Sequence, residues 1–247
     1  MVQEVLPPPL LPDPQATIDR LVEWIRAEVA SRNRLAAVVG VSGGLDSAVV
    51  ALLCQRALGV DRVIWLKMPD AAQFSTYGAL AGSFFFPLRS LTDQTFALVS
   101  ACGPNDCLRR GNIAARLRMI LLYDVAFRND GLVVGTGNRS EIALGYFTKH
   151  GDGACDLAPL ARLYKTQVRQ IAPLLGVPQE ILDAEPSAGL WPGQTDAGEL
   201  GYAYAELDPV IAAIDRLQNP QGPVADRVRQ LMGRGAHKSE GPAVPMM

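Results

Sequence analysis

The sequence predicts an α/β fold in which helices cover both faces of a doubly wound, mostly parallel sheet. Short apolar segments with strand character alternate with longer segments whose apolar residues recur at helical spacing. A glycine-rich turn directly follows the first apolar segment and precedes a helical one, as at the ligand-binding edge of such sheets. The length of 247 residues suits one domain with a substantial buried core.

The predicted elements follow one another along the chain. Residues 1–16 form a proline-rich arm, because closely spaced prolines preclude a regular helix. One domain then covers residues 17–247, and its first helix has Thr17 as a candidate N-cap. Strands are predicted at 35–41, 61–68, 84–91 and 132–136, with helices between them. The tail at 233–247 is rich in Gly and Pro, and we expect it to be mobile without ligand.

Charge and cysteine usage exclude several classes of protein. The net charge of −2 gives no electrostatic reason to expect a nucleic-acid partner. The N-terminus lacks a basic leader, and no apolar run reaches membrane-spanning length, so we expect a protein without membrane contact. Cys102 and Cys107 raise a metal or redox question, but the absence of a second pair favours incidental or buried thiols. A reducing cytoplasm is the default location.

The run Val41-Ser42-Gly43-Gly44-Leu45-Asp46-Ser47 follows the first predicted strand and opens a helix. Two adjacent glycines allow a tight turn that brings backbone N–H groups close to a bound anion, and a helix N-terminus adds its dipole. The run lacks the Gly-Lys-Ser/Thr of a Walker loop and does not match GxGxxG. Asp46 beside an anion cradle is repulsive unless a metal ion lies between them, which indicates pyrophosphate with bridging magnesium. The alternative is a strand–helix turn that binds nothing.

The SGGLDS loop resembles the signature of the N-type ATP pyrophosphatases. Further segments narrow the resemblance to ammonia-dependent NAD synthetase: GNIAARLRM at 111–119, GTGNRSE at 135–141, GYFTKHGDGACDLAPL at 145–160, LYKTQVR at 163–169, PSAGLWPGQTDAGELG at 186–201 and AHK at 236–238. It covers most of the chain apart from the first ~15 residues and residues 70–104. It implies a Rossmann-like fold of the adenine nucleotide alpha hydrolase type and a homodimeric, cytoplasmic ligase of NAD biosynthesis that binds magnesium.

The reaction implied by the resemblance is the amidation of deamido-NAD with ammonia. ATP, as co-substrate, adenylates the nicotinate carboxylate and releases pyrophosphate, and ammonia then displaces AMP to give NAD. Free ammonia or a separate donor protein is expected to supply the nitrogen.

The resemblance also assigns site residues. Lys165 and Asp152 are the candidate catalytic residues, and Asp46 and Glu141 the candidate magnesium ligands. The candidate ATP-binding residues are Gly40, Val41, Ser42, Gly43, Gly44, Leu45, Asp46, Ser47, Thr136, Lys165 and Ser187. The candidate deamido-NAD contacts are Arg116, Lys149, Asp156, His237 and Lys238, the last two in a tail that closes over substrate.

Physical arguments support some of these roles. Lys165 begins a predicted helix, where a cation is unfavourable unless an anion compensates it. Asp152 could take a proton from ammonium, or could simply stabilise an Asx-type turn. Glu141 could hold a metal, or could be an ordinary acid in the first turn of a helix. Lysine is rare in this chain, and three of the four lysines fall in the segments named above.

The predicted helix at 111–128 has apolar residues on more than one side, which indicates burial by the sheet and by a second subunit. Arg116 and Arg118 stand out on it as charges that either serve a site or snorkel to solvent.

Residues 69–83 depart from the resemblance, with no arginine, and precede Phe84-Phe85-Phe86. Two rival functions stay open. One is a related ATP pyrophosphatase that shares the loop but acts on tRNA or another acid. The other, suggested by this departing segment, is a catalytically weak nucleotide-binding protein.

Overall fold

A computed structural model describes residues 6–70, 83–100, 107–191 and 193–245. Its sheet has four parallel strands, β1 (Ala36–Gly40), β2 (Val63–Lys67), β3 (Ser83–Phe85) and β4 (Gly131–Val134), in the order β3-β2-β1-β4. Val38 of β1 lies opposite Ile64 of β2 and Val133 of β4. An isolated parallel bridge from Val134 to Leu157 extends the sheet beyond β4. The predicted parallel α/β fold is confirmed.

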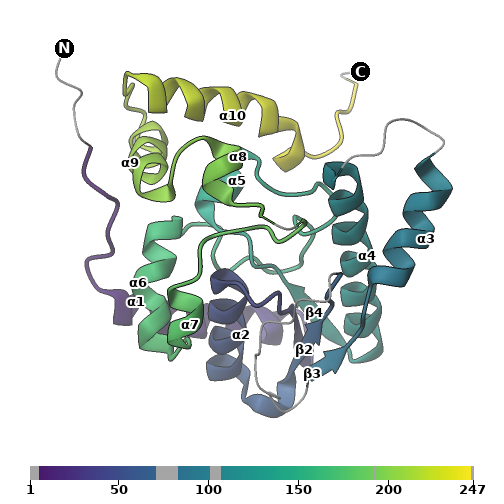
Figure 1. Cartoon of the computed structure of the whole chain (residues 1–247). Helices are drawn as coiled ribbons and strands as arrows, with labels where there is room; N and C mark the ends of the chain where they lie inside the picture. Colours follow the sequence, from purple (N-terminus) through teal and green to yellow (C-terminus); the bar gives the residue numbers. More distant parts are fainter. Residues whose placement is uncertain (1–5, 71–82, 101–106, 192, 246–247) are drawn as a thin grey trace.

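Helices cover both faces of the sheet, and a further helical layer lies beyond its carboxyl edge (Figure 1). The helices are α1 (Pro14–Ser31), α2 (Leu45–Leu58), α3 (Arg89–Ser100), α4 (Cys107–Arg128), α5 (Arg139–Leu144), α6 (Lys165–Leu175), α7 (Gln179–Leu182), α8 (Asp196–Leu200), α9 (Tyr204–Asp215) and α10 (Pro223–Ser239), with a 3-10 turn, η1, at Val60–Arg62. None of the described helices is long and apolar enough to cross a membrane.

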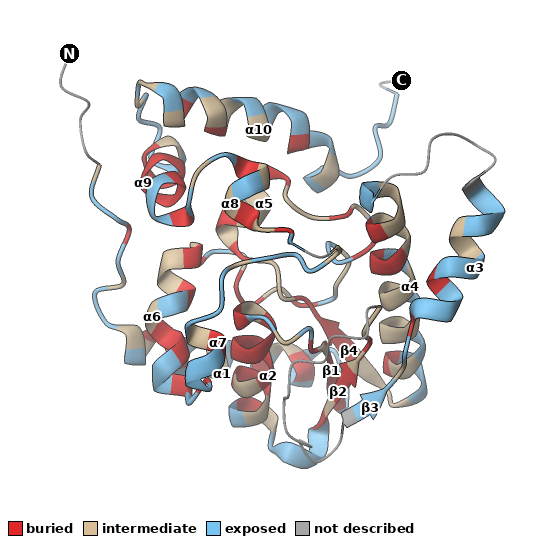
Figure 2. Cartoon of the chain, viewed as in Figure 1, coloured by how far each residue is buried: buried red, intermediate tan, exposed pale blue. Residues whose placement is uncertain are grey.

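Alternation along the strands divides the core between the two faces. Ala37 and Val39 of β1 pack toward α1, α2 and α6, whereas Val38 packs toward α4. This is the pattern of a parallel sheet buried on both sides. Strands β1, β2 and β4 are accordingly among the buried parts of the fold, whereas the edge strand β3 is exposed (Figure 2). A separate apolar cluster, which includes Leu144, Leu207 and Val228, joins α5, α9 and α10. The sheet layer and this helical layer therefore have distinct cores.

Three predicted boundaries differ from the structure. Helix α1 begins at Pro14 and its N-cap is Asp13, which accepts the Ala16 N–H at 2.9 Å, so the expected Thr17 cap is wrong and the arm meets the helix earlier. The strand predicted at 84–91 covers only Ser83–Phe85, because the chain leaves the edge of β2 and begins α3 at Arg89. The tail is helical as far as Ser239, and its mobility stays a prediction.

Two features singled out in the sequence fall largely outside the described residues. Cys102 is one of them, so its proposed relation to Cys107 stays a prediction. Residues 71–82, which make up most of the segment that departs from the resemblance, are the other.

Helix α4 packs on the sheet by one side and leaves apolar side chains on the other. Ala114, Ala115 and Ala126 are buried, whereas Ile120 is 55% and Phe127 is 90% exposed. Phe84 and Phe85 are about half exposed on the edge strand, at 51% and 50%. The second apolar side predicted for the helix is therefore present on the surface of the single chain.

Candidate active site

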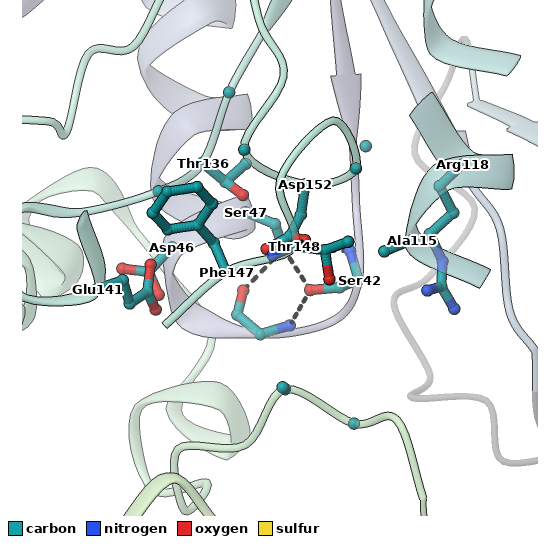
Figure 3. Close-up of a pocket in the computed structure, with 18 of the residues that line it drawn as sticks. Ser42, Asp46, Ser47, Ala115, Arg118, Thr136, Glu141, Phe147, Thr148 and Asp152 are labelled. Atoms are coloured by element: carbon teal, nitrogen blue, oxygen red, sulfur yellow. Dashed lines mark hydrogen bonds between the residues drawn. The ribbon is translucent and has the colours of Figure 1, made fainter. Parts of the chain in front are cut away.

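A cavity of about 880 Å³ opens at the carboxyl edge of the sheet (Figure 3). It lies between the ends of β1, β2 and β4 and the helical layer, which is where parallel α/β sheets bind ligands. Most of the predicted site residues line it: Gly40, Val41, Ser42, Gly43, Gly44, Leu45, Asp46, Ser47, Thr136, Glu141, Asp152, Lys165, Ser187 and Lys238. Residues predicted from separate segments of the sequence thus meet in one cavity.

The loop after β1 is shaped by its own hydroxyl groups. Gly43 has φ of +91°, which favours glycine, and Gly44 is the N-cap of α2 without a capping side chain. Ser42 Oγ accepts the Gly44 N–H at 3.1 Å, and Ser47 Oγ donates to Gly44 O at 2.9 Å. Ser47 Oγ also accepts the Ser42 N–H at 3.2 Å. These bonds hold a compact turn at the positive end of α2, which is suited to bind an anion.

One buried cation joins the two predicted metal ligands. The Lys165 ammonium forms an ion pair with Asp46 Oδ2 and lies 3.4 Å from Glu141 Oε1. Lys165 is only 5% exposed, and its Nζ lies 5.3 Å from the centroid of the Tyr204 ring. Burial opposes the charge, but the two carboxylates outweigh it and raise the pKa of Lys165. Lys165 therefore stays a cation in the cavity.

Glu141 caps the start of its helix and also faces Lys165. Its backbone N–H donates to Asn138 Oδ1 at 3.0 Å and its Oε2 accepts the Asn138 N–H at 3.1 Å, which forms a capping box at the start of α5. Its other oxygen faces Lys165. Burial, reinforced by Asp46, raises the pKa of Glu141 to about 8 although Lys165 opposes the shift. One ammonium thus does not keep the pKa of Glu141 low while Asp46 lies beside it.

This shortage of positive charge fits a divalent cation. Asp46 and Glu141 offer hard carboxylate oxygens, and magnesium is often held by one or two carboxylates together with phosphate oxygens of the substrate. Within the described ranges, no group of three or more His, Cys, Asp or Glu residues is placed to hold a metal. The two carboxylates would therefore hold magnesium with ligands from the nucleotide rather than as a closed protein site.

Asp152 stabilises a turn and also lines the cavity. Its Oδ1 accepts the Thr148 N–H at 2.9 Å, which is the turn-stabilising bond that the alternative interpretation predicts. The side chain nevertheless lines the cavity, as Thr148 does (Figure 3). Although Asp152 is solvent-accessible, partial desolvation within the cavity raises the pKa of its carboxyl group above the ordinary value. A carboxyl group with a raised pKa in a cavity is suited to accept a proton.

Lys149 and Lys238, which the resemblance assigns to the substrate, both donate to backbone carbonyls in the single chain. Their hydrogen bonds join the loop at 145–150 to the tail. Lys238 Nζ donates to Gly145 O at 2.7 Å and to Phe147 O at 2.8 Å. Lys149 Nζ donates to His237 O and lies 3.4 Å from Glu240 O. Lys149 and Lys238 line a smaller cavity of about 380 Å³, whereas His237 lines neither cavity.

The structure places Arg116 and Arg118 of α4 in different surroundings. Arg118 lines the main cavity, donates from Nε to Met68 O at 3.0 Å, and projects from α4 on the side of the view away from Asp46 and Glu141 (Figure 3). Burial lowers its pKa, which marks a desolvated guanidinium. Arg116 is exposed, lies outside the cavity lining and contacts Lys149 O at 3.4 Å.

Asp156, a further predicted substrate contact, also lies outside the lining of the main cavity. Its Oδ2 accepts the Val133 N–H at 2.8 Å, next to the bridge from Val134 to Leu157. In the single chain, the side chain of Asp156 therefore satisfies the backbone of β4.

Sequence reasoning missed Asp208 and Asp196. Asp208 is fully buried in α9 and accepts from Ser140 Oγ at 2.5 Å and from the Thr166 N–H at 2.9 Å. Burial raises its pKa, although both donors oppose the shift. Asp196 is 3% exposed and accepts from Tyr204 Oη at 3.0 Å. The available signal was an acid at the start of an apolar helical run, since Asp208 precedes the residues PVIAA.

The segment that carries Ser187 folds around Gln194. Ser187 Oγ donates to Gln194 O at 2.7 Å, and the Leu190 N–H donates to Gln194 Oε1 at 2.7 Å. Gln194 Nε2 in turn donates to Glu199 Oε2 at 2.7 Å. These bonds fix one rim of the cavity.

Comparisons with known proteins identify a family. The family model described as NAD synthase matches residues 17–242. An NH(3)-dependent NAD(+) synthetase from Archaeoglobus fulgidus is 40% identical over 237 residues, which cover 93% of this chain and 96% of the relative. The structure of NMN synthetase from Francisella tularensis is 31% identical with a TM-score of 0.85, covering 95% of this chain and 99% of that one. NH3-dependent NAD synthetase from Campylobacter jejuni, solved with the nitrate ion, is 27% identical with a TM-score of 0.79, covering 95% and 100%.

Proposed function

The chain belongs to the NAD synthase family, and from that premise we propose how its cavity carries out the reaction. The activity is that of an NH3-dependent NAD synthetase, a ligase that converts deamido-NAD to NAD. We propose that it proceeds in two steps. In the first, a nicotinate carboxylate oxygen attacks the α-phosphorus of ATP, and the bond to pyrophosphate breaks. In the second, ammonia attacks the acyl carbon of the adenylate, and AMP leaves.

The loop between β1 and α2 binds the phosphates that leave in the first step. The N-terminus of α2, where Gly44 supplies no capping side chain, offers its first-turn N–H groups as donors for an anion. Magnesium, when bound at Asp46 and Glu141, neutralises phosphate charge. The ammonium of Lys165, held between the same carboxylates, stabilises negative charge that develops as the phosphoryl bond breaks. This cluster of one lysine and two acids at an anion-binding turn is the observation that carries the proposal.

Asp152 and the tail complete the proposed site. Asp152 accepts the proton that ammonium or the attacking ammonia releases, and Thr136 and Ser187 contribute hydroxyl groups to the nucleotide from the cavity wall. Arg118 offers a guanidinium to bound phosphate. Lys238, anchored on Gly145 O and Phe147 O, holds the end of α10 over the cavity and so limits the entry of water.

A second copy of the chain is proposed to cover the outer side of α4. Ile120 and Phe127, at 55% and 90% exposure, would be buried in a homodimer interface. Arg116, which lies on this helix outside the cavity, would then contact the far part of the dinucleotide near the interface. Sedimentation of Phe127→Glu should show a monomer if the face pairs two copies, and an unchanged dimer would contradict this assignment.

The enzymatic test is direct. Purified protein is incubated with deamido-NAD, ATP, magnesium and ammonium, and NAD, AMP and pyrophosphate are quantified. Equal amounts of the three products support the proposed route. ADP and phosphate in place of AMP and pyrophosphate would reject the adenylate, and tight nucleotide binding without turnover would favour the binding-protein alternative.

A mononucleotide acceptor is the second candidate, favoured by the similarity to the NMN synthetase structure with its TM-score of 0.85. Both acceptors carry the same nicotinate group, so the cavity chemistry described above serves either. The ratio of kcat/KM for deamido-NAD to that for nicotinate mononucleotide decides between them. A ratio above one assigns the dinucleotide, and a ratio below one assigns the mononucleotide.

A further inference from the structure

The position of Lys165 depends on a buried network that reaches it through the backbone rather than through its side chain. The Lys165 N–H donates to Ser140 Oγ at 2.9 Å, and Ser140 Oγ donates to Asp208 Oδ1 at 2.5 Å. The second oxygen of Asp208 accepts the N–H of Thr166 at 2.9 Å. Ser140 and Asp208 are both fully buried. The carboxylate of α9 therefore binds the first turn of α6 both directly and through α5.

This arrangement replaces a conventional cap. Helix α6 begins at Lys165, and the preceding residue, Tyr164, is its N-cap but makes no side-chain cap hydrogen bond. The first N–H groups of a helix need acceptors when they are buried. Asp208 and Ser140 supply acceptors from two other helices, and a negative charge at this end also favours the helix dipole. The start of α6 is thus fixed by contacts across the fold in addition to its own Gln167, whose Oε1 accepts the Tyr164 N–H at 3.0 Å.

The same turn carries the side chain that meets both candidate metal ligands. Lys165 Nζ reaches Asp46 of α2 and Glu141 of α5 while its backbone N–H is held by Ser140, which is next to Glu141 in the chain. A shift of α6 along its axis would move the ammonium relative to both carboxylates. The hydrogen bonds of Asp208 go to Ser140 and Thr166, so its hold on the ammonium passes through the backbone of α6.

We propose that Asp208 is a positioning residue for Lys165, which sets the ammonium against Asp46 and Glu141 by holding the N–H of Thr166 and the hydroxyl of Ser140. The proposal rests on the role that we propose for Lys165. In this proposal Asp208 touches neither nucleotide nor ammonia and yet controls the rate of the phosphoryl step through Lys165.

Asp208→Asn tests the proposal with the smallest change of shape. The amide oxygen can still accept from Ser140, but its NH2 group meets the N–H of Thr166, so two donors face each other. Small displacements of a reacting group can cost roughly 100-fold in rate, and we expect kcat to fall by about 10- to 100-fold with KM for ATP and the acceptor little changed. Rates are normalised to the folded fraction, and ATP binding is measured separately by titration calorimetry.

Asp215→Asn is the matched control. Asp215 also lies in α9, pairs with Arg139 of α5 and accepts from Tyr164 Oη at 2.8 Å, but its bonds go to side chains rather than to a backbone N–H of α6. The control is expected to lower stability without lowering kcat per folded molecule. If both variants lose stability alone and keep kcat, Asp208 has a structural role only and the proposal is overturned.

A crystal structure of the Asp208→Asn variant provides a readout besides activity. The proposal expects Lys165 to be displaced from Asp46 while the loop after β1 is unchanged, and an undisturbed ion pair would overturn it. If the Asp208→Asn protein does not fold, Ser140→Ala takes its place. This variant removes the bridging hydroxyl but no charge, and it is also expected to lower kcat. Absence of amidation by the wild-type protein would instead reject the proposed function.

Discussion

The ammonium of Lys165 is paired with Asp46 across 119 residues of sequence, from the first turn of α6 to the first turn of α2. The two helices begin at the same edge of the sheet, so the ion pair closes the inner end of the cavity. Because Glu141 meets the same ammonium from α5, three elements contribute to one charged cluster.

Asp46→Ala should abolish pyrophosphate release while the fold survives. The substitution removes one of the two carboxylates that we propose to face the leaving phosphates, and the loss of one electrostatic group at a phosphoryl site costs roughly 100- to 1000-fold in kcat. Lys165 keeps Glu141 as a partner, so we expect a change in unfolding free energy of about 1 kcal/mol. A coupled pyrophosphate assay and urea denaturation measure the two effects.

Asp61→Ala is the control for that variant. Asp61 lies in η1 at the amino end of β2, whereas the cavity lies at the carboxyl end of that strand. It should leave both quantities unchanged. Retained turnover in folded Asp46→Ala protein would remove Asp46 from the mechanism.

Arg118→Ala should weaken the binding of a phosphate-bearing substrate. Hydrogen bonds to charged groups contribute about 1.5–3 kcal/mol, which corresponds to roughly a 10- to 100-fold rise in KM. Separate KM values for ATP and for the acceptor show which of the two substrates the guanidinium contacts. Arg128→Ala, an exposed arginine at the end of the same helix, is the control. If neither KM changes, Arg118 does not bind substrate.

Gly235→Ala should displace α10 from α5. A Cβ at Gly235 would lie 2.5 Å from Gly145 Cα and 2.9 Å from Gly145 N, so the backbone has to move. We expect a loss of about 1–3 kcal/mol in stability and weaker acceptor binding, because the contacts of Lys238 with Gly145 O and Phe147 O depend on this approach.

Gly233→Ala provides the contrast within α10, since a Cβ there meets nothing within 4 Å. Alanine is the better helix former, so this variant should gain about 0.5–1 kcal/mol. Urea denaturation distinguishes the pair, and equal stabilities would show that Gly235 and Gly145 are not in contact.

The thiols should differ sharply in reactivity. Burial raises the pKa of the Cys54 thiol to about 12, whereas Cys107 is exposed. At a pH of about 8 a thiol reagent should therefore label Cys107 and spare Cys54, as mapped by peptide mass spectrometry. Because the folded pKa of Cys54 lies above its ordinary value of 9.0, its contribution to stability is complete below that value and is lost as the pH rises toward about 12. Rapid labelling of Cys54 in the folded protein would contradict its burial.

The sequence predicts the central strands well because their apolar runs are short and bounded by turn residues. It fails at residues 86–91, because Pro87 has no N–H to donate and α3 begins at Arg89, although the Phe86 N–H still donates to Lys67 O at 2.9 Å. Apolar periodicity could place Arg116 and Arg118 on a helix but could not say which faces the cavity. Residues two positions apart point in different directions, and only the docking of α4 on the sheet decides between them.

The acidic residues of the site also differ in how far the sequence predicts their positions. Asp46 and Glu141 are predicted at one edge of the sheet because both follow strands, and the structure brings both to Lys165. Asp208 escaped prediction because its partners are a hydroxyl in α5 and a backbone N–H in α6, 68 and 42 residues away. Such a contact depends on how separate helices pack and leaves no local motif.

The division of the core into a sheet layer and a layer of α5, α9 and α10 has a consequence for handling the protein. Lys165 lies where the two layers meet, so a shift of one layer relative to the other would break the cluster of Lys165, Asp46 and Glu141 before either core unfolds. Catalysis should accordingly disappear at a lower urea concentration than helical circular dichroism, and recover on dilution without a refolding delay.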